Sequence, residues 1–167
     1  QLDINLQQPK SEGSIKLSSP NPFDKPIIDP NYLSDQRDIE DFTKAFRHLR
    51  YITEQDAFKD VLSSEISPGA NVKTDDDIHS AIRNLTTTGH HPVSTCRMGS
   101  DNDKGAVLDN KFKVRGTQNL RVVDASAFPD QINGNINAAV IMMGEKAADI
   151  ILDIPPLKRE DPREIKI

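Results

Sequence analysis

Two adjacent histidines, His90 and His91, stand in the segment GHHPVSTCRMG, which runs from position 89 to position 99. Pro92 disfavours helical backbone in the residue before it, so His91 is held extended and is well placed to line a cleft. An imidazole titrates near neutral pH and can take up a proton during a reaction. His91 is therefore a candidate catalytic base, and an ordinary surface histidine is the alternative.

The same segment holds the single cysteine of the chain, Cys96. The neighbouring Arg97 favours a thiolate, but no partner constellation for a nucleophile is visible, so a buried structural thiol is the preferred interpretation. The spacing of His90, His91 and Cys96 matches no zinc pattern, and no metal site is predicted.

A second segment with chemical potential begins with the sequence Asp124-Ala125-Ser126 and continues to NGNIN at 133–137. A strand that ends in Asp-Ala-Ser, followed by a Gly/Asn turn into a helix, presents free backbone N–H groups at the positive end of the helix dipole. An anionic group or an electron-rich ring fits there. Plain capping of the helix by Asn135 or Asn137 is the equal alternative.

Three helices are predicted to position these segments. Apolar residues spaced by three or four favour a helix that begins after Ser34 or Asp35 and ends near Ile52. Its charged residues, Arg50 among them, are expected on the solvent face.

The second helix is predicted to begin after Thr74, because Asp77 stands at the capping-box position, and to fade within 86–89. A third helix, with a broad apolar face, is expected over 138–152 and is ended by Pro155.

Short strands are predicted between the helices. Alternation over 13–17 indicates a half-buried strand, whereas four prolines make 18–30 irregular or an edge. The segment 107–114 is predicted to hold a short strand before Gly116, and 120–124 is a predicted strand because it is a β-branched run.

Composition excludes some classes of protein. The 167 residues carry 21 Lys and Arg against 26 Asp and Glu, a net charge of −5, which gives no basic footprint for nucleic acid. No apolar run approaches the roughly 18 residues of a membrane span, so a soluble chain is expected. We expect a fragment or a processed chain. The sequon at Asn84 lies in a predicted helix and is poor evidence for secretion, so localisation stays open.

In this order, the segments resemble the C-terminal part of the glucose–methanol–choline (GMC) family of flavin-dependent oxidoreductases. The family pattern His-Pro-x-Gly-Thr-x-x-Met-Gly resembles 91–99, and Asn-Leu-Arg-Val-Val-Asp-Ala-Ser is found at 119–126. The pattern Gly-Asn-x-Asn-Ala, with a following Gly-Glu-Lys-Ala-Ala-Asp helix, is similar to 134–149. The chain departs at Ser94, where the family usually has Gly.

The resemblance implies a role for each matching residue. His91 falls on the active-site histidine over the reactive edge of the flavin, and Asn135 falls on the second active-site position. The cofactor contacts that it implies, these two included, are His90, His91, Asp124, Ala125, Asn135, Asn137 and Ala138. Asp124 and Ala125 correspond to the segment that reaches the phosphate and ribityl portion.

The resemblance also implies fold and function. It indicates an α+β fold: an antiparallel sheet with covering helices in a substrate-binding part (1–115), then a strand and helix (116–153) that complete an FAD-binding domain, then a charged tail (154–167). The implied activity is FAD-dependent oxidation of an alcohol to an aldehyde, ketone or lactone, with His91 as base. A non-redox lyase of the hydroxynitrile lyase type and a catalytically inactive binding subunit are the alternatives.

The family's dinucleotide-binding Gly-x-Gly-x-x-Gly element does not occur in this sequence. The expected partners are therefore an N-terminal FAD-binding portion, from the same precursor or a second chain, and a small-molecule alcohol.

Overall fold

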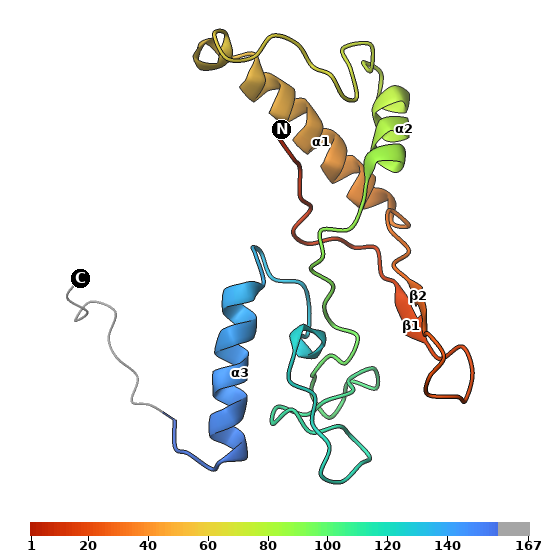
Figure 1. The fold of residues 1–167 in the computed structure, drawn as a ribbon, viewed down its shortest axis with the longest axis vertical. Coiled ribbons are helices and arrows are strands. Elements are labelled where there is room, and N and C mark those ends of the chain that lie inside the picture. Colours follow the sequence, from red (N-terminus) through yellow and green to blue (C-terminus); the bar gives the residue numbers. More distant parts are fainter. Residues whose placement is uncertain (157–167) are drawn as a thin grey trace, which may run out of the picture. The chain divides into compact units, whose positions relative to one another are not determined.

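The computed structural model describes residues 1–156, and Figure 1 shows its elements. They are strands β1 (Ser14–Lys16) and β2 (Ile27–Asp29), helices α1 (Gln36–Thr53), α2 (Asp75–Leu85) and α3 (Asn137–Ile151), and the short 3-10 helices η1 (Asp56–Phe58) and η2 (Ala125–Ala127). The chain divides into two compact units, Gln1–His91 and a second that begins at Pro92. The predicted tail lies outside the described residues from position 157 onward.

The two long helices of the first unit begin where the sequence predicts. The Asp35 side chain accepts a hydrogen bond from the Arg37 N–H and caps α1. At α2, Thr74 and Asp77 form the expected capping box. The two helices pack against each other, and each contributes one fully buried isoleucine, Ile39 and Ile78.

Arg50 does not lie on the solvent face of α1, so that prediction is wrong. Its guanidinium donates to both carboxylate oxygens of Glu65 at 2.8 Å and to the carbonyl oxygens of Gly69 and Val72. It also lies over the Phe46 ring, 4.3 Å from the centroid. Glu65, Gly69 and Val72 lie 15 to 22 residues after Arg50, so their bonds to Arg50 hold the loop between α1 and α2 in place.

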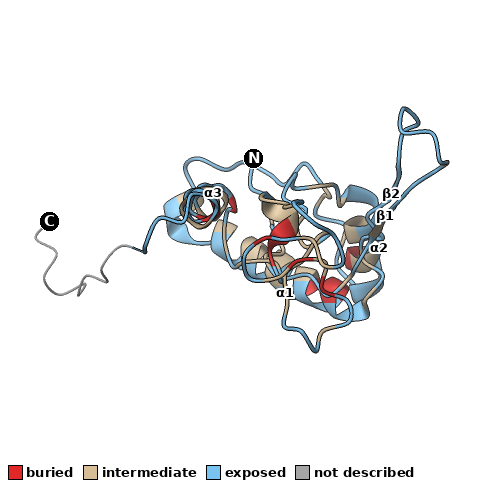
Figure 2. Cartoon of the chain, turned by 90° about the horizontal axis from the view of Figure 1, so that it is seen from below, coloured by how far each residue is buried: buried red, intermediate tan, exposed pale blue. Residues whose placement is uncertain are grey.

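Strands β1 and β2 pair antiparallel, from Ser14 opposite Asp29 to Lys16 opposite Ile27. The strand expected at 13–17 is confirmed, and β2 is an edge strand within the proline-rich segment. The predicted half-burial is wrong: Ile15 is 54% exposed, and both strands are coloured as exposed in Figure 2. Within residues 1–156 this two-stranded ribbon is the whole sheet, which is smaller than expected.

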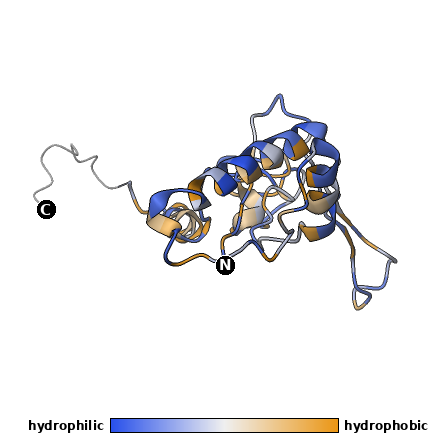
Figure 3. Cartoon of the chain, turned by 90° about the horizontal axis from the view of Figure 1, so that it is seen from above, coloured by the Kyte–Doolittle hydropathy of each residue, from blue (hydrophilic) through white to orange (hydrophobic). Residues whose placement is uncertain are grey.

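The second unit is built around α3, which runs within one residue of its predicted range. Seven of its buried side chains form one cluster: Leu108, Phe112, Ala127, Phe128, Ile136, Met143 and Ala147. The helices alternate between hydrophilic and hydrophobic positions, as amphipathic packing requires (Figure 3). No helix within residues 1–156 has the length and apolar character needed to cross a membrane.

The strands predicted at 107–114 and 120–124 do not form. These segments make only isolated bridges: Leu108 pairs with Met98 and with Val114, and Lys113 pairs with Arg121. Phe112, Gly116 and Asn119 adopt left-handed backbone, with φ of 63°, 75° and 59°. Because a strand requires continuous extended backbone, these residues interrupt each ladder after a single pair.

Candidate functional site

The histidine pair ends the first unit. His90 has left-handed backbone (φ 58°), and its N–H donates to Thr88 Oγ1 at 3.0 Å. His91 follows in irregular, non-helical backbone, as Pro92 requires, and both histidines are exposed. An exposed imidazole on a sharply turned segment is accessible to a substrate.

The residues that follow the histidines are bonded to the Asp-Ala-Ser segment by their backbones. Ser94 N donates to Ala125 O at 3.4 Å, Cys96 N to Ser126 O at 2.9 Å and Met98 N to Ala127 O at 3.1 Å. Both segments lie in the second unit. The structure therefore brings together two motifs that lie about thirty residues apart in the sequence. The sequence marks each motif as a candidate for chemistry, but its local patterns do not pair them.

Asp124 caps the short helix η2. Its Oδ1 accepts from the Ser126 N–H at 2.8 Å and from the Ser126 hydroxyl. The structure gives Oδ2 no partner among the described residues, and Asp124 is exposed. The carboxylate thus keeps one oxygen that can accept a hydrogen bond from a ligand hydroxyl.

Asn135 occupies the turn before α3. Gly134 has φ 146°, which glycine adopts easily, and this turns the chain into the helix. Asn135 Oδ1 accepts from the Asn137 N–H at 3.2 Å, but the N-cap of α3 is Ile136, so neither Asn135 nor Asn137 is the cap that the sequence predicts. Because Oδ1 is engaged, the amide presents its Nδ2–H₂ donors outward from an exposed side chain.

Part of the α3 N-terminus is open. The N-cap residue by geometry is Ile136, and its side chain caps nothing. The first intrahelical bond runs from Val140 N to Ile136 O, so the N–H groups of Ala138 and Ala139 precede it. Ala138 is exposed, and an acceptor oxygen can approach here at the positive end of the helix dipole.

The two halves of this region share one core. Ala125 of η2 and Ala139 of α3 both pack against the buried cluster of the second unit. The predicted cofactor residues Asp124, Ala125, Asn135, Asn137 and Ala138 therefore lie on two elements fixed by common packing. His90 and His91 belong to the other unit, so a meeting of His91 and Asn135 stays a prediction.

Two buried polar atoms in the second unit have no hydrogen-bond partner among the described residues, Ser94 Oγ and Arg121 Nε. Ser94 also has left-handed backbone, with φ 69°. The family position usually holds Gly, and a left-handed φ is the physical reason for that preference. A flavin cofactor carries phosphate, hydroxyl and carbonyl oxygens, and the open helix N-terminus fits such an acceptor.

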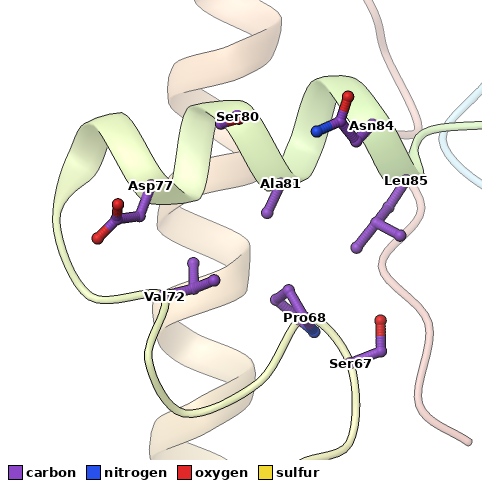
Figure 4. A pocket seen from close by; sticks show the side chains of 8 residues that line it. All are labelled: Ser67, Pro68, Val72, Asp77, Ser80, Ala81, Asn84 and Leu85. Atoms are coloured by element: carbon purple, nitrogen blue, oxygen red, sulfur yellow. The ribbon is translucent and has the colours of Figure 1, made fainter.

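A cavity of about 380 Å³ lies in the first unit, between α2 and the loop before it. Figure 4 shows Pro68, Val72, Ala81 and Leu85 pointing toward its centre, between α2 and the preceding loop. None of the predicted site residues lines it. Among residues 1–156, no three His, Cys, Asp or Glu side chains gather closely enough to hold a metal ion.

Comparison with known proteins identifies the family to which these motifs belong. The sequence profile of the family described as GMC oxidoreductase matches residues 9–144. The chain is 45% identical over 157 residues to an oxygen-dependent choline dehydrogenase of Vibrio vulnificus. This match covers 94% of this chain and 28% of that protein.

Two solved structures are similar. An FAD-dependent oxidoreductase from Chaetomium thermophilum has a TM-score of 0.82 at 34% identity, covering 88% of this chain and 25% of that one. Pyridoxine 4-oxidase from Mesorbium loti has a TM-score of 0.79 at 37% identity, covering 85% and 27%. The chain thus spans about a quarter of the length of these relatives. With a family profile that covers most of its length and relatives of this identity, the chain belongs to the GMC oxidoreductase family.

Proposed function

We propose that this chain supplies the C-terminal part of an FAD-dependent enzyme that oxidises an alcohol. The observation that carries the proposal is the backbone bonding of 94–98 to 125–127, because it fixes the segment after His91 against the segment assigned to the cofactor. Residues 1–115 contribute to the substrate side, and 116–153 complete the FAD-binding domain. An N-terminal FAD-binding portion supplies the remainder.

Each proposed role follows from the chemistry of the side chain. When bound, FAD supplies the hydride acceptor for the carbinol carbon. The His91 imidazole takes the hydroxyl proton, a contribution of about 10²–10⁴ in rate. Asn135 donates from Nδ2 to the substrate oxygen, because its Oδ1 is held by the Asn137 N–H, and an amide does not compete for the proton.

The cofactor contacts follow the same geometry. Asp124 Oδ2 accepts from a ribityl hydroxyl, and Ala125 lies beside it. The Ala138 N–H, at the start of α3 beside Asn137, would face an electron-rich part of the ring, because the Asn137 N–H is already donated to Asn135 Oδ1. His90, which precedes His91 in the sequence, is the remaining proposed cofactor contact.

The substrate is a small alcohol. The names of the relatives suggest which alcohols to test: choline and pyridoxine. A hydroxynitrile lyase and an inactive binding subunit are the competing functions, and neither predicts reduction of bound FAD by an alcohol.

The test is anaerobic mixing of the assembled enzyme, this chain with its N-terminal portion, with each alcohol while flavin absorbance is followed. We expect bleaching of the flavin, and we expect His91→Ala to retain FAD but slow its reduction at least ~10²-fold. His48→Ala is the matched control, since His48 is an exposed histidine of α1. Near-normal reduction in the His91 variant refutes its role, and failure of every alcohol to bleach the wild-type flavin refutes the oxidase.

A further inference from the structure

A pocket of about 300 Å³ lies in the second unit, at the turn between positions 113 and 121. Two left-handed residues, Gly116 and Asn119, bend the chain back on itself there, and 113 and 121 form an antiparallel bridge. The residues that line the pocket are Lys113, Thr117, Gln118, Asn119, Leu120 and Arg121. None of them has a part in the proposed oxidation or its cofactor contacts, so a ligand of this pocket is a further one.

The bridge places two positive charges opposite each other, because its two residues are Lys113 and Arg121. The backbone hydrogen bonds on either side of it run, at 3.0 and 3.1 Å, from Val114 N to Leu120 O and from Val122 N to Phe112 O. Lys113 and Arg121 are therefore a non-hydrogen-bonded pair, the kind in which the two side chains lie closer together. Like charges directly opposite each other destabilise such a pair.

No carboxylate of the described chain forms an ion pair with either cation. The acids closest in sequence are engaged by backbone N–H groups. Asp109 Oδ1 accepts from Lys113 N at 2.9 Å, and Asp124 Oδ1 accepts from Ser126 N at 2.8 Å. The segment 110–123 holds four Lys and Arg and no acid, in a chain whose net charge is −5. The excess of positive charge is thus local to this turn.

Four side chains of the pocket can donate to a ligand. Arg121 Nε is sealed, so a ligand cannot contact it. The two terminal nitrogens of the same guanidinium are not among the buried, unpartnered atoms of residues 1–156, and since no described acceptor binds them, they are open to solvent. Lys113, Gln118 and Asn119 are exposed, and the two amides add neutral N–H donors.

We propose that this pocket binds a phosphate group, either as the free ion or on a small phosphomonoester. A phosphate group carries about −1.5 to −2 charge at neutral pH and three strong acceptor oxygens, which matches two cations and two amide donors. The planar guanidinium of Arg121 can bind two of these oxygens at once, and the Lys113 ammonium acts as a point charge. A carboxylate brings one negative charge and would leave half of the positive charge uncompensated. This proposal does not depend on the proposed function.

The test is calorimetric titration of the assembled enzyme with inorganic phosphate in a chloride buffer. We expect one site, and we expect Lys113→Gln and Arg121→Gln each to weaken binding at least about tenfold. Lys113 is exposed, so its variant should fold even if the Arg121 variant does not. Lys104→Gln is the matched control, because it removes the same charge from an exposed lysine of this unit that does not line the pocket, and it should bind phosphate as the wild type does.

Two further probes identify the class and source of the ligand. Acetate should bind at least about tenfold more weakly than phosphate, and equal affinities would overturn the assignment to phosphate. Glycerol phosphate should compete with phosphate: tighter binding identifies a phosphomonoester as the ligand, and equal or weaker binding identifies the free ion.

Two other results overturn the proposal while bleaching of the flavin by an alcohol still stands. Phosphate binding that neither pocket variant weakens is that of an adventitious ion only. A wild type that binds no phosphate, with a melting temperature lowered by Lys113→Gln and not by Lys104→Gln, shows that a carboxylate from elsewhere in the polypeptide fills the pocket.

Discussion

The two units of the chain reach stability by different means. The first unit has two long helices, yet Ile39 and Ile78 are its only hydrophobic residues classed as buried among those described, alongside the polar Asp38 and Thr43. The second unit has one helix of comparable length and little other regular structure, yet it holds a contiguous apolar cluster. Regular secondary structure and a hydrophobic core are thus separate properties in this chain.

In the first unit, buried polar side chains contribute stability that apolar packing contributes in the second. The Asp38 carboxylate, 2% exposed, accepts from Lys10 N at 2.7 Å and from Ser11 N at 2.8 Å and Ser11 Oγ at 2.5 Å. The Ser11 hydroxyl in turn accepts from the Asp35 N–H at 3.0 Å. The N-terminal segment is therefore fixed to the start of α1 by one buried carboxylate.

The largest effect should come from the apolar cluster of the second unit. Leu108 is fully buried, so Leu108→Ala leaves a cavity and should cost about 3–5 kcal/mol of unfolding free energy. Urea unfolding followed by circular dichroism measures the loss. Both tyrosines of the chain, Tyr32 and Tyr51, lie in the first unit, so their fluorescence reports that unit separately.

Leu120→Ala is the matched control for this comparison, because Leu120 is about half exposed in the same unit. It should cost less than about 1 kcal/mol. Equal losses for the two leucines would mean that the cluster does not stabilise the second unit in the way the burial indicates.

The polar anchor of the first unit should give the next largest effect. Asp38→Asn keeps the shape but replaces one carboxylate oxygen by an NH₂ group, so at least one of the three donors loses its acceptor and we expect a loss of about 2 kcal/mol. The tyrosine signal should report the change. Asp41→Asn removes an exposed pair with Lys44 from the same helix and should cost under about 0.5 kcal/mol. If the two variants proved equally stable, the contrast between polar and apolar units would fail.

The helices could be predicted from the sequence because their signals are local. A capping Asp35, the Thr74–Asp77 box and apolar residues at helical spacing all act within a few positions. The strands at 107–124 could not, since β-branched composition says nothing of the backbone at a neighbour. The left-handed backbone of Phe112 could not be predicted, because phenylalanine has no preference for that conformation.

The same distinction holds for the candidate site. The sequence predicts the turn before α3 and non-helical backbone at His91, since a Gly/Asn turn and a proline act locally, but it places the cap of α3 at Asn135 or Asn137 instead of Ile136. The pairing of Ser94 with Ala125 depends on long-range folding, and periodicity carries no signal for it. The prediction for Arg50 is wrong for the same reason. Helical spacing places it on the solvent face, whereas its hydrogen-bond partners lie 15 to 22 residues away.

The smallest effect should come from the ion pair that Arg50 makes. Hydrogen bonds from Arg50 lower the pKa of Glu65 below its usual 4.5, against the opposing effect of burial. The ionised carboxylate is thus favoured in the folded state, and its stabilisation is complete above pH 4.5 and lost as the pH falls through the lowered pKa. Glu65→Gln should therefore cost about 1 kcal/mol at pH 6 and progressively less in acid, whereas Glu40→Gln, an exposed change in α1, should show no such trend. Urea titrations across this range measure the difference. A Glu65→Gln loss that stayed constant down to the lowest pH would show that Glu65 stabilises the loop without its charge, for example by accepting from the Gly69 N–H, and the first unit would then depend on neutral hydrogen bonds instead of charge.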